Sequence, residues 1–417
     1  MKNIDASIIT IGDELLIGQV IDTNSAWMAQ QLNKAGVSVR ARVAVGDSAE
    51  EIIKALDTEG ANSDVILITG GLGPTSDDIT KELLCDYFGG RMVVNEGALQ
   101  NVKYLFEKIY KKPVSQVNLL QAEVPDVCEV IQNHRGSAPG MVFHKDNTIY
   151  ISMPGVPYEM QGIMSDVIPY LEKHFQLPAI IHRTILTAGI GESALAEIIA
   201  DFETNLPKEI RLAYLPNYGM VRLRLTTSGF DKIATEKLIN DQFIQLKELV
   251  KKYMVTDEDE SMQVVLGKLL LQKRKTISTA ESCTGGTIAS LITSVAGSSA
   301  YYEGSIVSYS YNVKEGLLNV KPDTLNTYGA VSEETVREML KGLLDKLNTD
   351  YGIAVSGIMG PDGGTSDKPV GTVWIAVGNK EKCIAQKLQQ RFGRSKNIEV
   401  TSVMALNLMR KFILENE

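Results

Sequence analysis

The sequence predicts an α/β protein of three domains, and two observations carry this prediction. Short apolar stretches alternate with segments of helical periodicity in both halves of the chain, which is the pattern of sheets wrapped by helices. The length of 417 residues also exceeds what one compact core usually holds. We place the domains at residues 1–170, 171–256 and 257–417, with α/β outer domains and a small α+β middle domain.

The composition is that of an ordinary globular protein. Hydrophobic residues make up 44% and charged residues 22%, which excludes disordered, collagen-like and disulfide-scaffold classes. The formal net charge of −9 disfavours nucleic acid or an anionic membrane as a partner. No apolar run approaches the roughly 20 residues of a membrane helix, and the first residues lack signal-peptide features. We expect a cytoplasmic protein whose four cysteines are reduced, since they form no CxxC pair.

The N-terminal domain is expected to hold a parallel sheet. Residues 8–11 form its opening strand, and residues 37–43 alternate apolar and polar side chains, as a strand with one solvated face does. Residues 64–69 read DVILIT, which is typical of a central strand covered on both faces. We also expect a helix capped by Asn24 and a long amphipathic helix whose apolar stripe spans residues 99–109.

Two glycine-rich loops follow strands of this domain, GDELLIG at residues 12–18 and GGLGPTSDD at residues 70–78. Ligands of open parallel sheets bind beyond the carboxyl ends of the strands, so both loops should face one crevice. Glycines let the backbone approach a phosphate closely, although a purely structural turn is the alternative. Carboxylates in the same region would repel a phosphate unless a divalent cation lay between them. The expected metal-binding carboxylates are Glu14, Asp47, Asp77 and Asp78.

These N-terminal motifs resemble known families. The run GGLGPTSDDIT is similar to the signature of the molybdopterin-binding fold, and GDELLIGQVIDTNS together with PGVPYEM is similar to the amino-terminal half of the CinA family. The resemblance implies an ADP-ribose pyrophosphatase that needs Mg, Mn or Co and releases AMP and ribose 5-phosphate. It assigns catalysis to Asp47 and Asp78. The implied substrate-binding residues are Asn24, Gly70, Gly71, Gly73, Thr75, Pro154 and Gly155.

The middle domain is expected to follow a β-α-β-β-α order. A strand at residues 184–187 precedes a helix from Glu192, and a hairpin around Asn217 precedes a helix from Asp231. Together with the CinA resemblance, this order looks like a KH-type fold. A KH module that binds nucleic acid needs a GxxG loop, whereas the candidate loop reads AGIGES, so we favour packing or dimerisation over RNA binding. The hairpin carries three candidates for a small basic patch, Arg211, Arg222 and Arg224.

The C-terminal domain places a hydroxyl at a strand-to-helix turn. Residues 276–280 read as a strand and ESCTGG follows at once, so Ser282 could cap the next helix or act as a nucleophile. No histidine lies beyond His182, which excludes a Ser-His-Asp triad within this domain. Lysine is the remaining common base if burial lowers its pKa, and Lys314 lies near the end of a following strand. Cys283 is a rival nucleophile, with a buried inert thiol as the alternative.

Several motifs of this domain resemble the nicotinamide mononucleotide deamidase family, the usual carboxy-terminal half of CinA proteins. They are AESCTGG, AGSS, YSYNVK, GAVSEE and GPDGGTSDKPVGTVW. The resemblance implies a cofactor-free amidohydrolase in which Ser282 attacks the carboxamide, while Lys314 serves as base and then as acid to the departing ammonia. Ser299 and Tyr309 match further hydroxyls of the family's site. The implied substrate-binding residues are Thr284, Gly285, Gly286, Ser356, Gly357 and Gly360, with either Arg394 or Lys396 at the phosphate.

Taken together, the resemblances imply a bifunctional enzyme of pyridine-nucleotide salvage and, by family analogy, a homodimer. Two alternatives stay open: a deamidase whose N-terminal domain only binds nucleotide, and a non-enzymatic adaptor linked to competence or DNA damage. An adaptor has no need of a paired nucleophile and base, which favours an enzyme. Molybdopterin adenylyl transfer would suit the N-terminal domain but not the C-terminal half.

Overall fold

The computed structural model describes residues 3–75, 78–217 and 219–416. The chain packs as two compact units, one of Met1–His182 with Thr226–Asp241 and the other of Arg183–Leu225 with Gln242–Glu417. Three principal sheets, of six, four and five strands, confirm the α/β class expected from the sequence. Among the described residues, no helix combines the length and the apolar character that a membrane span requires.

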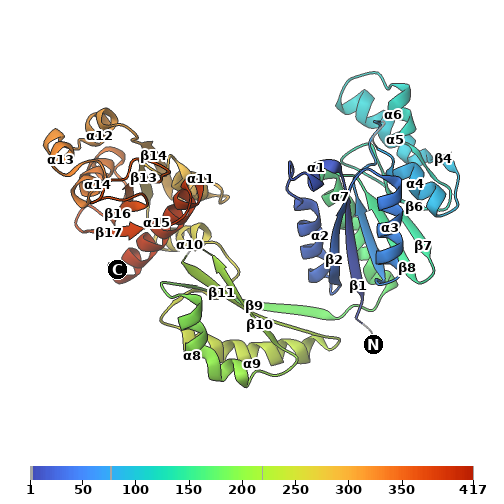
Figure 1. Ribbon diagram of the computed structural model, residues 1–417, viewed down its shortest axis with the longest axis horizontal. Helices are drawn as coiled ribbons and strands as arrows, with labels where there is room; N and C mark the ends of the chain where they lie inside the picture. Colours follow the sequence, from blue (N-terminus) through green and yellow to red (C-terminus); the bar gives the residue numbers. More distant parts are fainter. Residues whose placement is uncertain (1–2, 76–77, 218, 417) are drawn as a thin grey trace. The chain divides into compact units, whose positions relative to one another are not determined.

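The N-terminal domain is built on a six-stranded sheet of order β2-β1-β3-β8-β7-β6 (Figure 1). Its first four strands run parallel, β7 pairs antiparallel with β8, and β6 pairs antiparallel with β7. The expected parallel sheet is present and has an antiparallel edge, because residues 146–147 join β7 to β8 as a tight hairpin with Asp146 at φ 55°. The strands are β1 (Asp5–Ile11), β2 (Ser38–Val45), β3 (Val65–Thr69), β6 (Glu129–Ile131), β7 (Gly140–Lys145) and β8 (Thr148–Met153).

Helices cover both faces of this sheet (Figure 1). Because successive strand residues point to opposite faces, Ile8 packs in a core with Met28 of α2 and residues of α7, while Ile9 packs in another with Leu56 of α3 and residues of α4. The strand β3 is buried throughout, as predicted for a central strand. The remaining elements are α1 (Asp13–Leu16), α2 (Thr23–Lys34), α3 (Ala49–Gly60), α4 (Thr80–Tyr87), β4 (Met92–Val94), α5 (Glu96–Tyr104), η1 (Leu105–Ile109), α6 (Gln116–Leu120), β5 (Glu123–Pro125) and α7 (Pro157–His174).

Two helices of this domain differ from expectation. Asp22, not Asn24, caps α2: its Oδ1 accepts a hydrogen bond from the backbone N–H of Ser25 at 2.9 Å. The predicted long helix is divided, since α5 is followed by the π-helical turn η1. Val102 is fully buried whereas Ile109 is 54% exposed, so the apolar stripe covers only the first part of the segment.

The middle domain has a β-α-β-β-α-β order, one strand longer than predicted. Its sheet has the order β10-β11-β9-β12, with β12 antiparallel to β9. The expected hairpin and both expected helices are present. The elements are β9 (Ala179–Ala188), α8 (Glu192–Thr204), β10 (Arg211–Asn217), β11 (Met220–Gly229), α9 (Lys232–Val250) and β12 (Met254–Thr256).

The C-terminal domain has a five-stranded sheet of order β14-β13-β15-β16-β17 (Figure 1). The strands β14, β13 and β15 run parallel, and β16 and β17 continue the sheet antiparallel. Residues of α10, α11 and α15 pack on one face and residues of α14 on the other. The elements are α10 (Met262–Lys273), β13 (Ile277–Glu281), α11 (Thr287–Thr293), η2 (Ser298–Ala300), β14 (Tyr302–Val307), α12 (Tyr311–Leu318), α13 (Pro322–Tyr328), α14 (Glu333–Leu347), β15 (Tyr351–Gly357), β16 (Thr372–Gly378), β17 (Cys383–Gln389) and α15 (Arg394–Asn416).

Candidate active site

Ser282 lies at the turn that joins the buried strand β13 to helix α11. Its backbone N–H donates to the carbonyl of Val355 at 3.0 Å, which extends the pairing with β15 one residue beyond the strand. Gly285 and Gly286 follow with φ of 60° and 99°, a left-handed backbone that favours glycine and lets the chain enter α11 at once. The turn leaves Ser282 nearly buried, with 7% of its area exposed.

Lys314 meets this hydroxyl from a different element. It lies on helix α12, which Ser310 caps, and not near the end of a strand as expected. Its side chain is fully buried. Its Nζ is 2.9 Å from Ser282 Oγ, 2.6 Å from the carbonyl of Ser308 and 3.2 Å from the carbonyl of Tyr309. The structure therefore brings the two side chains into direct contact.

The surroundings of this amine suit a general base. Burial lowers the pKa of Lys314 to about 8. A neutral amine has two N–H donors and one lone pair, which match two carbonyl acceptors and one hydroxyl donor. The three neighbours of Nζ are of these kinds, with Ser282 supplying the hydroxyl. The arrangement can therefore hold the lysine in the form that removes a proton from serine.

Cys283 is not placed as a competing nucleophile. Its side chain is buried in the core that α11 and α15 share with the sheet, and the thiol lies close to Gly357, where an added Cβ would stand 3.1 Å from Sγ. Burial raises the pKa of Cys283 to about 12, so the thiolate is strongly disfavoured near neutral pH.

Arg394, at the start of α15, reaches the rim of this site. Its Nη2 donates to Tyr309 Oη at 3.2 Å, and its Nη1 donates to the carbonyl of Gly360 at 3.0 Å. Lys396 lies 3.5 Å from the carboxylate of Glu399 on the same helix. The structure thus places Arg394, rather than Lys396, beside the loops that border Ser282.

The other predicted residues of this site differ in burial and in hydrogen bonding. Ser356 is buried at the end of β15, next to the residue that holds Ser282. Ser299 is exposed in η2, and its hydroxyl makes no hydrogen bond with a described residue. The hydroxyl of Thr284 donates to the carboxylate of Glu281 at 2.7 Å instead of facing outward. Glu281 was not singled out from the sequence, although its position directly before the nucleophile in AESCTGG was a signal.

A cleft of about 390 Å³ opens at the carboxyl ends of β1, β3 and β8 in the N-terminal domain. Both glycine-rich loops face it, as the sheet topology predicts. Asn24 lines an adjoining hollow of about 130 Å³, where its Nδ2 donates to the carbonyl of Gly155 at 2.7 Å. The residues of the cleft that sequence analysis named are Glu14, Asp47, Gly70, Gly71, Gly73, Asp78, Pro154 and Gly155.

The carboxylates of this cleft also organise its loops. Asp47 Oδ2 accepts from the backbone N–H of Asp13 at 3.0 Å, and Asp78 Oδ2 accepts from the backbone N–H of Thr75 at 3.0 Å. Asp77 lies outside the described residues. Within the described ranges, no three His, Cys, Asp or Glu side chains gather as a metal site. One or two carboxylates still fit a Mg²⁺-type ion that takes its other oxygen ligands from a phosphate and water.

Sequence reasoning missed Glu159, which lines the same cleft. Its carboxylate accepts from Asn133 Nδ2 at 2.7 Å, and that amide also donates to the carbonyl of Ala138 at 2.8 Å. Burial raises the pKa of Glu159 above its ordinary value. Its place in the motif PGVPYEM was a signal that the residue could belong to the site.

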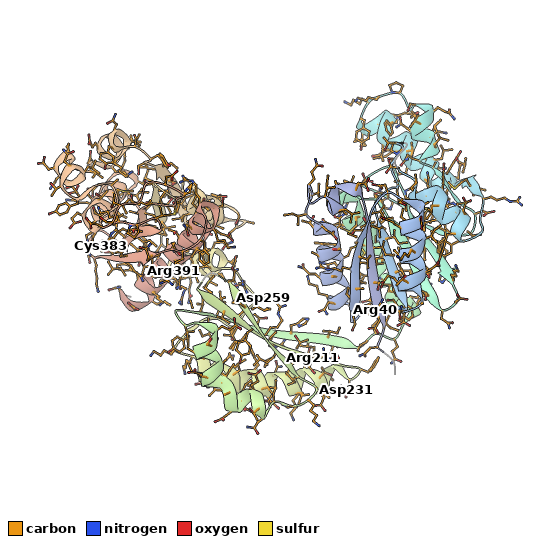
Figure 2. All side chains as sticks on the ribbon, in the orientation of Figure 1. Arg40, Arg211, Asp231, Asp259, Cys383 and Arg391 are labelled. Atoms are coloured by element: carbon orange, nitrogen blue, oxygen red, sulfur yellow. The ribbon has the colours of Figure 1, made fainter. Side chains whose placement is uncertain are left out.

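A neighbouring carboxylate pairs with two arginines of the middle-domain hairpin. Asp259, labelled in Figure 2, pairs with Arg222 at 3.3 Å and with Arg224 at 3.1 Å. Arg211, also labelled there, begins β10. Two of the three arginines of the possible basic patch are thus engaged within the protein, which supports packing over nucleic-acid binding for this surface.

The fold and the site together define a three-domain α/β protein that carries a buried serine–lysine pair. Comparison with known families matches residues 7–173 to the "Probable molybdopterin binding domain", residues 182–256 to the "Damage-inducible protein CinA KH domain" and residues 259–413 to the "CinA C-terminal domain". The chain belongs to the CinA family, and its three-domain layout is confirmed.

Full-length relatives support this assignment. A CinA-like protein of Cytophaga hutchinsonii is 46% identical, with 99% of both chains covered. A CinA-like protein of Flavobacterium psychrophilum is also 46% identical with the same coverage. A putative competence-damage inducible protein of Caldicellulosiruptor bescii is 38% identical over 98% of this chain and 99% of its own.

Proposed function

We propose that the C-terminal domain hydrolyses the carboxamide of nicotinamide mononucleotide to nicotinate mononucleotide and ammonia. The observation that carries this proposal is the 2.9 Å contact between Lys314 Nζ and Ser282 Oγ, with the lysine fully buried. A nucleophile and a base at this distance form an activated pair for acyl transfer. A non-enzymatic adaptor offers no reason to bury a lysine amine against a serine, since burying a charged amine is costly.

In the proposed reaction, Ser282 acts as the nucleophile and Lys314 acts first as the base and then as the acid. Lys314 takes the proton of Ser282, and Oγ attacks the carboxamide carbon to form a tetrahedral intermediate. The lysine ammonium then gives its proton to the departing nitrogen, and ammonia leaves an acyl ester on the serine. Water attacks this ester with Lys314 again as base, which releases the carboxylate product and restores Ser282. Arg394 at the rim is the cation we assign to the substrate phosphate.

For the N-terminal domain we propose hydrolysis of ADP-ribose to AMP and ribose 5-phosphate. The support is a cleft that combines glycine loops for a pyrophosphate with Asp47 and Asp78. A divalent ion such as Mg, Mn or Co would be held by these two carboxylates, with Glu14 beside them, and would supply charge neutralisation at the pyrophosphate. Asn24 and the glycine loops would bind and orient the nucleotide. The protein would then act twice in pyridine-nucleotide salvage, and the family resemblance adds the proposal of a homodimer.

Ammonia release from nicotinamide mononucleotide should rise with pH around a midpoint near 8. Burial lowers the pKa of Lys314 to about 8, and only the neutral amine can accept the serine proton. The check is kcat/KM for ammonia release between pH 6 and pH 10 in the presence of a chelator. A rate that stays flat across this range, or that falls as pH rises, would contradict a lysine base.

The variant Asp78→Asn should lose most ADP-ribose hydrolysis and keep full deamidase activity. Its carboxylate faces the cleft that we assign to the pyrophosphate, and losing one charge there weakens the hold on a divalent ion. AMP formation would be followed by chromatography with each metal and with a chelator, with Asp86→Asn as an exposed control on α4. Unchanged AMP formation in Asp78→Asn would show that Asp78 takes no part in the chemistry. If the wild type binds ADP-ribose but does not hydrolyse it, the N-terminal domain only binds nucleotide.

A further inference from the structure

Glu281 carries a fully buried carboxylate directly before the nucleophile. In the described part of the chain it meets no cation: its partners are two hydroxyls and three peptide N–H groups from the first turn of α11 and its approach. Such donors can satisfy the oxygen atoms of a buried side-chain carboxyl group without an ion pair. They are Thr279 Oγ1 at 3.2 Å, Thr284 Oγ1 at 2.7 Å, and the N–H groups of Gly286 at 3.0 Å, Ile288 at 3.0 Å and Ala289 at 2.8 Å.

These hydrogen bonds decide which donors of the turn stay available to a substrate. Glu281 occupies the N–H groups at the start of α11, so an anion of the substrate cannot use them. The N–H groups of Cys283 and Thr284 come directly after the nucleophile, and among the described turns and loops neither donates to a backbone carbonyl. The residue after a serine nucleophile commonly supplies a donor to the oxyanion of the tetrahedral intermediate.

We propose that Glu281 is a positioning residue of the amidohydrolase site, which fixes the turn at residues 282–286 so that the N–H groups of Cys283 and Thr284 form the oxyanion hole. The inference rests on the proposed deamidase function. Because Glu281 makes its hydrogen bonds to the turn and not to Lys314, its contribution is to the geometry of the donors and not to proton removal by the base.

The test is Glu281→Gln, which keeps the shape of the side chain but turns one acceptor oxygen into an NH₂ group facing peptide donors. We expect kcat for ammonia release from nicotinamide mononucleotide to fall about 100-fold, the scale of losing one oxyanion donor. KM should change less than about threefold, and the pH midpoint should stay where the wild type has it, because the base is untouched. Glu303→Gln, an exposed position on β14, is the matched control and should keep wild-type values.

Thr284→Val is the second variant, since it removes one donor to Glu281 but keeps the peptide N–H. It should lower kcat by a smaller factor in a folded protein. Wild-type kcat in both folded variants, or an effect on KM or on the pH midpoint alone, would overturn the proposal. If Glu281→Gln does not fold, Thr284→Val decides by the same criterion.

A serine-directed fluorophosphonate separates this inference from the proposed substrate. Its phosphonyl oxygen occupies the same oxyanion position when Ser282 is labelled, so labelling should be slow in Glu281→Gln and fast in Glu303→Gln. If the wild type is labelled at Ser282 but releases no ammonia from nicotinamide mononucleotide, the proposed function is refuted and the positioning role of Glu281 is not. Equal labelling rates in Glu281→Gln and the wild type would refute the positioning role of Glu281.

Discussion

Replacing Ser282 with alanine is expected to lower ammonia release from nicotinamide mononucleotide by a factor on the order of 10⁴ to 10⁶, the range that follows removal of a serine nucleophile. The hydroxyl is the atom that Lys314 Nζ contacts at 2.9 Å. Without this hydroxyl the base has no nucleophile to activate. The fold loses only one oxygen atom, from a side chain that is almost buried. Initial rates of ammonia formation, with circular dichroism to verify folding, provide the measurement.

The matched control is the neighbouring residue, Cys283→Ala. Its thiol is buried in the core and burial raises its pKa to about 12, so we expect most of the activity to remain. The variant removes one buried sulfur atom, which costs some stability but no chemistry. The opposite ranking, with Cys283→Ala inactive and Ser282→Ala active, would make the protein a thiol enzyme and would refute the serine–lysine assignment.

The serine–lysine pair shows how far the sequence could lead. The motifs and the lack of histidine beyond His182 pointed to Ser282 and Lys314, which the fold brings together although they lie 32 positions apart. The helical position of the lysine was missed because SYSYNVK alternates polar and larger side chains, as a half-buried strand does. The capping role of Ser310, which ends that pattern, was the local signal for a helix.

In the N-terminal domain, topology was more predictable than local detail. That both glycine-rich loops face one cleft followed from the rule for parallel strands and needed no side-chain information. The choice of Asp22 over Asn24 as helix cap depends on a shift of two residues, which lies within the uncertainty of helix ends in a sequence. The antiparallel edge was signalled by the polar residues 146–147 between two apolar runs.

Contacts between distant segments could not be read from the sequence where no motif or topology rule connects the two segments. Arg394 and Tyr309 are 85 positions apart, and nothing in either local motif indicates that their side chains meet. The same holds for Asp259, whose pairing with Arg222 and Arg224 reduces the positive charge of a patch that looked basic in the sequence. Such pairings follow from the packing of whole elements, which local periodicity does not specify.

Replacing Lys314 with methionine is expected to abolish ammonia release and to change how stability depends on pH. Methionine fills a similar volume without a charge, so it removes both the base and the cost of burying an ammonium. In the folded wild type burial lowers the pKa of Lys314 to about 8, whereas the unfolded chain has the ordinary value near 10.5. Between these values the unfolded state binds the extra proton, so the lysine's contribution to the unfolding free energy rises with pH.

Below pH 8 Lys314 is protonated in both the folded and the unfolded state, so the free-energy cost of burying its ammonium is fully present. Above about pH 10.5 the lysine is neutral in both states, and this cost is gone. The unfolding free energy of Lys314→Met minus that of the wild type should therefore fall by about 3 kcal/mol from pH 7.5 to pH 10.5, at about 1.4 kcal/mol per pKa unit. Urea denaturation at each pH measures it, with Lys321→Met, exposed before α13, as a control without a pH-dependent difference. A stability difference between Lys314→Met and the wild type that is constant across this range would mean that the amine is not desolvated, and the lysine could not serve as the base.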